Sequence, residues 1–287
     1  MKNFISRKII RERNWYKFHL IKNFKNNLKN KNRLQSTFDQ LKVNKKQDNL
    51  LFNYKHFNKT NLYPIYNYLS KRLHGNCLSI GSGKAHLEYH LSKKFKILPT
   101  DINDSFINFN KKIKIKKFNI LDCSDKDIKK IGKFDCIFIP NIEYLFTNKQ
   151  LKKFLSNLKK LSSKKTDIFF CFRSRYTFIT NIIDHIICPL EIFFTKYIKF
   201  IKYKGFIIKK IHHGFRRKDN EIEKIITNYF LIKSVYRDMF TLEYKRSILF
   251  RILRIDKILK YINTFKLRLK SPTAQKSKPF TTSCKGT

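Results

Sequence analysis

The stretch Cys77-Leu-Ser-Ile-Gly-Ser-Gly-Lys-Ala-His86 decides the fold of this chain. A short apolar run leads into Gly81 and Gly83, and a helical pattern follows, with Leu87, Leu91 and Phe95 four residues apart. The chain has only seven glycines, so two in one turn indicate a requirement of the backbone. A strand, a Gly-x-Gly turn and a helix bring backbone N–H groups close to a ligand. The alternative is a tight strand–helix turn without a ligand.

An acid follows at the position that a nucleoside site requires. Asp101 ends the next apolar run, twenty residues after Gly81. A carboxylate at that point accepts hydrogen bonds from the hydroxyls of a ribose. We therefore predict a nucleoside-cofactor site.

Apolar runs and helical patterns alternate through the middle of the chain. We expect strands at 77–80, 96–100, 117–121, 134–139 and 167–172, and helices at about 61–73, 84–94, 104–111, 124–131 and 151–161. This alternation predicts an α/β fold, a doubly wound and mostly parallel seven-stranded sheet. The glycine turn, Asp101, Asp122 and Asn141 follow predicted strands, so they should meet at the carboxyl edge, where ligands bind in such sheets.

The flanking segments break this alternation. We expect a basic arm and linker at 1–50, the main domain at 60–255, an insertion of helices or a lid at about 173–210, and a basic, disordered tail at 266–287. After a helix at 220–227, residues 230–236 and 247–253 alternate like an antiparallel strand pair. Residues 1–33 hold eleven Lys and Arg against one acid, Glu12, with apolar residues about four apart. They fit a basic amphipathic helix on a membrane or RNA, a solvated arm, or a helix that covers the domain.

The net charge of +44 has two explanations. One is a polyanionic partner, either nucleic acid or an anionic membrane surface. The other is coding bias, because Lys, Asn, Ile and Phe are abundant while Gly, Ala and Pro are scarce. The six cysteines form no C-x-x-C pair, which argues against a zinc site. Four of them lie in or next to predicted strands, which fits free thiols in a reducing, intracellular setting. We expect no transmembrane segment, and a cytoplasmic location, with peripheral contact to the inner face of a membrane as an option.

Taken in order, these motifs resemble the class I S-adenosylmethionine-dependent methyltransferases of type 11/12. The resemblance covers about 60–172 and 205–255. Residues 78–85 look like the glycine motif, 119–122 like the third-strand motif, and 134–139 like the fourth strand. Asn141-Ile-Glu-Tyr144 stands where the family often has a Glu-His pair. The resemblance implies S-adenosyl-L-methionine as cofactor, bound by Ile80, Gly81, Ser82, Gly83, Asp101, Ile102, Asp122, Cys123 and Asn141.

The sequence departs from the family in the glycine motif. Ser79 stands where many members carry an acid, and Lys84-Ala85 replaces the usual Thr-Gly. These departures affect the contact to the methionine amino group. The nearest rival within the fold is a dinucleotide-binding oxidoreductase, which prefers Gly or Ala where this chain has His86.

Candidates for the chemistry lie near the predicted carboxyl edge. A base is needed where an acceptor must lose a proton, and Glu143, His212 and His213 fit that role, as does His185. The non-catalytic alternatives are that Glu143 caps the following helix and that the histidines lie in a basic surface loop. Arg173, Arg175, Arg216 and Arg217 are suited to grip an anionic acceptor, or are solvated charges.

The insertion is aromatic, aliphatic and basic at once, which suits a small-molecule, glycan or lipid-linked acceptor. The alternatives are RNA methylation, and a non-catalytic protein that binds polyanions or a membrane surface on the same fold.

Overall fold

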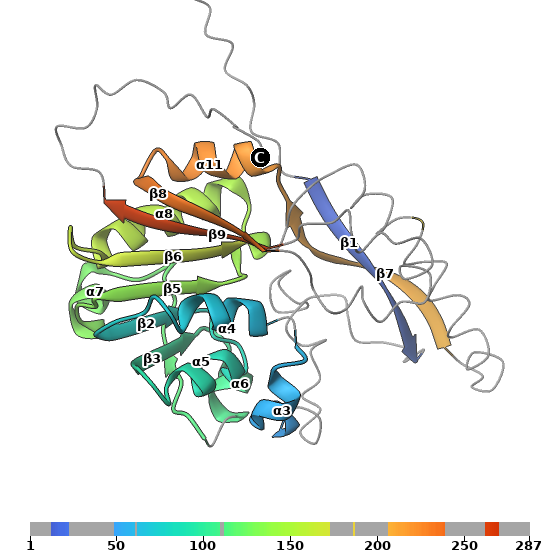
Figure 1. Cartoon of the computed structure of the whole chain (residues 1–287). Coiled ribbons are helices and arrows are strands. Elements are labelled where there is room, and N and C mark those ends of the chain that lie inside the picture. The colour runs from blue at the N-terminus through green and yellow to red at the C-terminus, as the bar shows by residue number, and fades with distance from the viewer. Residues whose placement is uncertain are drawn as a thin grey trace, which may run out of the picture.

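The computed structural model describes residues 13–22, 49–60, 62–109, 112–172, 186, 206–238 and 262–269. In that part of the chain, seven strands form one sheet in the order β4-β3-β2-β5-β6-β9-β8 (Figure 1). The bounds are β4 Lys116–Lys117, β3 Lys96–Asp101, β2 Asn76–Ile80, β5 Cys136–Pro140, β6 Asp167–Phe172, β9 Ile262–Leu269 and β8 Phe230–Asp238. The pairs from β4 to β6 are parallel, and those of β9 with β6 and β8 are antiparallel. This is the predicted doubly wound methyltransferase-like sheet.

The order of the strands places a crevice beside β2. The chain runs outward from β2 to β3 and β4, and then returns to add β5 on the other side of β2. In sheets of this kind, ligands bind where the direction of winding reverses, at the carboxyl ends of the strands. The fold therefore puts the glycine turn that follows β2 at the centre of a binding edge.

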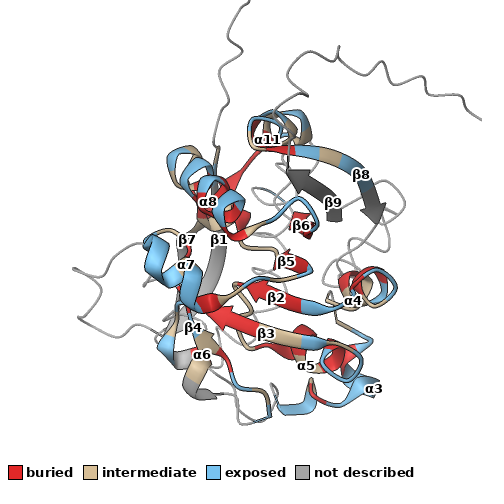
Figure 2. Cartoon of the chain, turned by 90° about the vertical axis from the view of Figure 1, so that its left-hand side faces the viewer, coloured by how far each residue is buried: buried red, intermediate tan, exposed pale blue. Residues whose placement is uncertain are grey.

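Helices cover both faces of the sheet, and the strand residues alternate between them. On one face, Leu78 and Ile80 of β2 belong to a core that also holds residues of α7 (Asp125–Ile131), α8 (Asn148–Leu161) and α11 (Asp219–Ile226). On the other face, Cys77 packs with residues of α3 (Tyr54–Phe57), α4 (Tyr63–Leu69) and α5 (His86–Leu91). A short helix, α6 (Asp104–Phe109), follows β3. Figure 2 shows the buried strands between these helices.

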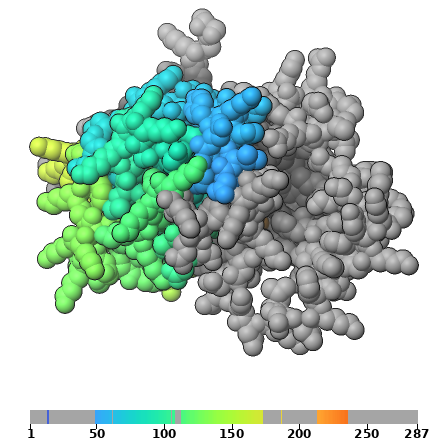
Figure 3. All heavy atoms as spheres, turned by 90° about the horizontal axis from the view of Figure 1, so that it is seen from below, coloured from blue at the N-terminus to red at the C-terminus, as the bar shows by residue number. Residues whose placement is uncertain are grey.

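The segment before the sheet is held by aromatic contacts. Phe52 lies edge-on to His86 and Tyr89, with ring centroids 4.7 and 5.0 Å apart, and Phe57 stacks on His90 at 4.0 Å. In Figure 3, this segment, in blue, lies against the teal surface of the residues that follow it. Residues 49–57 thus cover α5 and close that face of the domain.

The antiparallel pair uses a different partner strand from the one we expected. The first strand, β8, is where we placed it, but it pairs with Ile262–Leu269 rather than with 247–253, which lie outside the described residues. The sequence Phe265-Lys-Leu-Arg-Leu269 has the apolar–polar alternation of a strand. We had assigned it to the tail because it is basic, so the last strand includes residues 266–269 of that expected tail.

A two-stranded ribbon stands beside the main sheet. Strand β1 (Arg13–Lys22) pairs antiparallel with β7 (Phe206–Arg216), and the ribbon extends away from the sheet in Figure 1. Residues 13–22 are therefore not helical, and residues 206–210 belong to a strand rather than to the insertion. A run rich in aromatic residues, Trp15-Tyr-Lys-Phe18, favours a strand when an unpaired edge is near. Most of the insertion, 173–185 and 187–205, lies outside the described residues.

Candidate functional site

A cavity of about 410 Å³ opens at the carboxyl edge beside β2. Among the predicted cofactor residues, the ones that line it are Ile80, Gly81, Ser82, Gly83, Asp101, Ile102 and Asn141. They come from the ends of β2, β3 and β5, so the topology brings together Ile80 and Asn141, which are 61 positions apart. Its volume falls within the range of small-molecule sites.

The glycine turn is tied to the neighbouring strand. The N–H groups of Gly81 and Ser82 both donate to the carbonyl of Thr100 at 2.9 Å, and the Ser82 hydroxyl accepts from the Thr100 N–H at 3.1 Å. Gly81 has φ +78°, and a Cβ on it would lie 2.5 Å from Cγ2 of Ile142. Gly83 also has positive φ, but a Cβ there would meet nothing within 4 Å. Gly81 is needed for packing, whereas Gly83 faces open space at the cavity.

Asp101 is a buried carboxylate at the end of β3. Its Oδ2 accepts from the N–H of Gly83 at 2.7 Å, and its Oδ1 accepts from the N–H of Asn103 at 2.9 Å. Burial raises the pKa of Asp101, while these backbone N–H groups act in the opposite direction. The two bonds fix the carboxylate against the glycine turn, at the wall of the cavity.

Asp122 and Cys123 lie outside the lining of this cavity, contrary to our expectation. Strand β4 ends at Lys117, and the chain then turns, with the Leu121 N–H donating to Oδ1 of Asn119 at 3.1 Å. This turn puts Asn119 on the cavity wall. Asp122 is exposed, accepts from Nδ2 of Asn119 at 2.9 Å and pairs with Lys153 at 2.9 Å, and this pairing lowers its pKa. The thiol of Cys123 donates to the carbonyl of Ile120 at 3.3 Å.

Asn119 therefore stands where we had placed Asp122. The sequence predicts that this strand ends at Leu121, whereas β4 ends four residues earlier, at Lys117. Apolar side chains surround this part of the cavity, and they are Ile102, Phe106, Phe118, Ile120 and Leu121. An amide among apolar walls suits a flat heteroaromatic ring that carries both donors and acceptors.

Asn141 has two unusual features at the end of β5. It adopts a left-handed conformation with φ +54°, which is uncommon outside glycine. Its side-chain Oδ1 is buried and has no hydrogen-bond partner among the described residues. A buried acceptor without a donor is costly, and such costs cluster at ligand sites. Asn141 lines the cavity, so this unsatisfied acceptor belongs to a residue of its wall.

The loop after Asn141 separates the predicted catalytic residues. Glu143 is fully buried in the short helix η1 (Glu143–Leu145) and does not line the cavity, whereas Tyr144 does. The His213 ring stacks on Tyr144, with centroids 5.1 Å apart and planes 12° apart. His213 lies at a bulge in β7, because Gly214 pairs with Trp15 and His212 pairs with Tyr16. Such bulges re-aim side chains. The side chain of His212 and all of His185 lie outside the described residues.

The predicted arginines have different environments. Arg217 is fully buried and holds the loop after Asn141. Its Nε donates to Oδ1 of Asn148 at 2.8 Å, and its Nη1 and Nη2 donate to the carbonyls of Glu143 and Phe146 at 3.4 and 2.6 Å. These bonds occupy the guanidinium, so it is unsuited to grip an acceptor. Arg216 is buried too and does not line the cavity. Arg173 and Arg175 lie outside the described residues.

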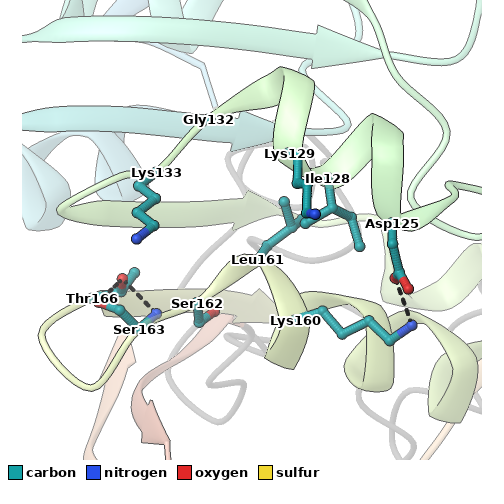
Figure 4. A pocket seen from close by; sticks show the side chains of 10 residues that line it. All are labelled: Asp125, Ile128, Lys129, Gly132, Lys133, Lys160, Leu161, Ser162, Ser163 and Thr166. Atoms are coloured by element: carbon teal, nitrogen blue, oxygen red, sulfur yellow. Dashed lines mark hydrogen bonds and ion pairs between the residues drawn. The ribbon is translucent and has the colours of Figure 1, made fainter.

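A second cavity, of about 590 Å³, lies between α7, the end of α8 and the turns that precede β5 and β6 (Figure 4). Lys129, Lys133 and Lys160 surround it, and several of its polar groups are used within the fold. Lys160 pairs with Asp125 at 2.9 Å, and the Thr166 hydroxyl accepts from the Ser163 N–H and donates to the Phe134 carbonyl. The cavity beside β2, with its orphaned Asn141 acceptor, is the better candidate site.

Comparisons with known proteins agree with this fold. No family model and no curated protein matches the sequence. One similar structure is the "complex between the Haloferax volcanii Trm112 methyltransferase activator and the putative methyltransferase". One chain of this complex is 8% identical to the present chain, with a TM-score of 0.50, over 81% of this chain and 98% of that chain.

Two other solved structures are similar at TM-scores of 0.48 and 0.45. The N-methyltransferase NodS from Bradyrhizobium japonicum, in complex with S-adenosyl-L-homocysteine, is 15% identical over 84% of this chain and 100% of that chain. The magnesium protoporphyrin IX methyltransferase of Synechocystis, with the same molecule bound, is 12% identical over 85% and 90%. The likeness to the chain of the Haloferax volcanii complex, at 8% identity, concerns the fold alone, which is the Rossmann-like methyltransferase fold. Within the described residues, no helix is both long and apolar enough to cross a membrane.

Proposed function

We propose that this chain is an S-adenosylmethionine-dependent methyltransferase. The observation that carries the proposal is the cavity beside β2, where the glycine turn, the buried carboxylate of Asp101 and the orphaned acceptor of Asn141 line one space. It lies where the winding of the sheet reverses, which is the position expected for a nucleoside ligand.

The residues of the cavity fit the parts of the cofactor. Asp101 supplies a carboxylate for the ribose hydroxyls, and the apolar walls around Asn119 suit the adenine ring. The open space over Gly83 lets a ligand approach the main chain, and Asn141 offers an acceptor. When bound, the cofactor supplies an electrophilic methyl group. The chain's own residues hold it, and much of the barrier can be lowered by positioning alone.

The acceptor enters, on this proposal, from the side of Tyr144 and His213. Tyr144 lines the cavity, and the stacked His213 is half-buried behind it. Histidine is suited to take a proton from an acceptor near neutral pH. We favour His213 over Glu143 as the base, because half-buried His213 stacks on Tyr144 at the cavity wall, whereas Glu143 is fully buried. A small-molecule, glycan or lipid-linked acceptor remains our preferred class.

Methyl transfer to fractionated extracts tests this function. Full-length protein and methyl-tritiated S-adenosylmethionine are incubated with lipid, glycan, small-molecule and RNA fractions. We expect label in one fraction with the wild type and much less label with Asp101→Ala. Label in the RNA fraction would make RNA the acceptor in place of our preferred class. If no fraction leads to release of S-adenosylhomocysteine, the proposed methyltransferase activity is contradicted.

A second candidate is a non-catalytic protein that binds polyanions on this fold. The net charge of +44 favours it. It predicts binding to RNA or anionic vesicles that weakens steeply with salt, without any methyl transfer. If the same protein both binds polyanions and transfers methyl groups, it is an enzyme whose basic surface contributes an additional binding function.

A further inference from the structure

A carboxylate is buried directly behind the glycine turn. Glu88 of α5 is 1% exposed, and its Oε1 accepts from the hydroxyl of Ser79, on β2, at 2.6 Å. Its other oxygen, Oε2, is buried and lacks a hydrogen bond of good geometry among the described residues. Glu88 does not line the cavity, but Ser82 and Asp101 do. Both are close enough to change the pKa of Glu88: the charge of Asp101 raises it and the Ser82 hydroxyl lowers it. Glu88 therefore lies one layer behind the wall of the proposed cofactor site.

No positive charge balances this acid in the described part of the chain. The groups that face it are the hydroxyls of Ser79 and Ser82 and the carboxylate of Asp101, and its own helix carries His86 and His90 nearby. None of the ion pairs found among the described residues involves Glu88. The pKa of Glu88 is raised to about 7, mainly by burial and in smaller part by the charge of Asp101, while the Ser79 hydrogen bond acts in the opposite direction. A buried charge of this kind is costly unless an opposite charge comes near.

The proposed cofactor would bring that charge. Its amino-acid part carries an ammonium group, and its sulfonium is a second cation. In a site that excludes water, a cation interacts with a carboxylate across several ångströms more strongly than in water. Ser79 stands where many members of the family that the sequence resembles carry an acid, and the carboxylate beside it here is that of Glu88, from the following helix.

We propose that Glu88, held by Ser79, is the counter-charge for the ammonium group of the cofactor and gives up its proton when the cofactor binds. This inference rests on the proposed function. Glu88 acts as a positioning residue through the turn, not by touching the reacting atoms. If Glu88 served only to bind Ser79, its protonation would not change on binding.

Calorimetry measures the proton directly. Wild-type protein is titrated with S-adenosylhomocysteine at pH 7 in two buffers with different heats of ionisation. With a pKa of about 7, Glu88 is half protonated, so release of up to about half a proton is expected. Affinity should rise about tenfold between pH 6 and pH 8, because the ionised fraction rises about tenfold. A matched ligand, 5′-methylthioadenosine, lacks the ammonium and should show neither effect.

Two variants assign the proton to Glu88. Glu88→Gln keeps the size of the side chain and should lose both the proton release and the pH dependence, with affinity at least tenfold weaker at pH 8. Proton release that remains in this variant belongs to Asp101 or His86. Ser79→Ala removes the hydrogen bond that favours the carboxylate, so the release should move to higher pH. Circular dichroism and thermal melting confirm that each variant is folded.

The outcomes separate the two proposals. Binding by the wild type without proton release, or an unchanged pH profile in folded Glu88→Gln, overturns the role of Glu88 and leaves the cofactor site standing. If Glu88→Gln does not fold, the test is whether proton release in Ser79→Ala moves to higher pH. The absence of this shift overturns the proposed role of Glu88. Failure of the folded wild type to bind S-adenosylhomocysteine overturns the proposed function and this inference with it.

Discussion

The main-chain N–H of Gly83 donates a 2.7 Å hydrogen bond to Oδ2 of Asp101. This bond joins the turn after β2 to the end of β3, so the two motifs that suggested a nucleoside site meet at one wall. The carboxylate holds the turn and faces the cavity at the same time. Loss of the acid should therefore affect both the shape of the turn and the binding of a ribose.

Asp101→Ala should weaken the binding of S-adenosylhomocysteine at least tenfold. The substitution removes the acceptor of Gly83 and the proposed partner of the ribose, and a hydrogen bond to a charged group is worth about 1.5 kcal/mol or more. Asp125→Ala is the control, because Asp125 is an exposed acid that pairs with Lys160 and does not line the cavity beside β2. Titration calorimetry compares them, and equal affinities would count against the placement of the ribose.

The two glycines of the turn should respond differently to alanine. At Gly81, a Cβ collides with Ile142, so Gly81→Ala should distort the turn and lower both stability and affinity. At Gly83 there is space, and Gly83→Ala should cost only the left-handed backbone strain of about 1 to 2 kcal/mol. Thermal melts of both variants test this order. Equal losses would mean that Ile142 moves aside readily.

Arg217→Lys should destabilise the domain by about 2 to 4 kcal/mol. A lysine cannot reproduce the fork of donors that binds Asn148 and the carbonyls of Glu143 and Phe146. Arg72→Lys is the control, since Arg72 is exposed and donates to a single carbonyl, that of Tyr68, at 3.3 Å. Urea unfolding compares the two. A stable Arg217→Lys variant with a specific loss of acceptor affinity would restore Arg217 as a substrate residue.

Glu88→Gln should stabilise the free protein at high pH. Between pH 4.5 and 7 the folded state keeps the Glu88 proton that the unfolded chain has already released, so its contribution to stability falls as pH rises through this window. Above pH 7 the buried carboxylate costs about 3 kcal/mol relative to its ordinary pKa of 4.5. The neutral glutamine avoids this cost.

Unfolding at pH 8.5 and pH 4.5 checks the sign of that effect. The variant should be more stable than the wild type at pH 8.5 and show no such gain at pH 4.5. A loss of stability that is equal at both pH values would show that the hydrogen bond to Ser79, rather than the charge, dominates.

The fold was predictable because its signals are local. Apolar runs such as Asp167–Phe172 are buried on both faces, so the pattern marks the strand at its observed bounds. The acid Asp101 was predictable because it ends such a strand. The cap Ser124 begins α7 where the sequence predicts a helix. Helix α8 begins at Asn148, after the cap Thr147, which is three residues before the expected start at Leu151.

The errors come from features that depend on distant partners. The end of β4 is set by a turn around Asn119, which an apolar pattern does not reveal, so Asp122 was placed on the cavity wall. The segment at 13–22 becomes a strand because β7 offers an edge to pair with. Arg217 and Glu88 look like surface charges in the sequence, and only the packing of the loop after Asn141 and of the glycine turn shows that both are buried.

Calorimetric titration of the folded, full-length protein with S-adenosylhomocysteine tests the central claim most directly. The cavity beside β2 predicts one-to-one binding with a micromolar dissociation constant, lost or strongly weakened in Asp101→Ala. Absence of binding by the wild type would contradict the assignment of this cavity to the cofactor, and with it the methyltransferase.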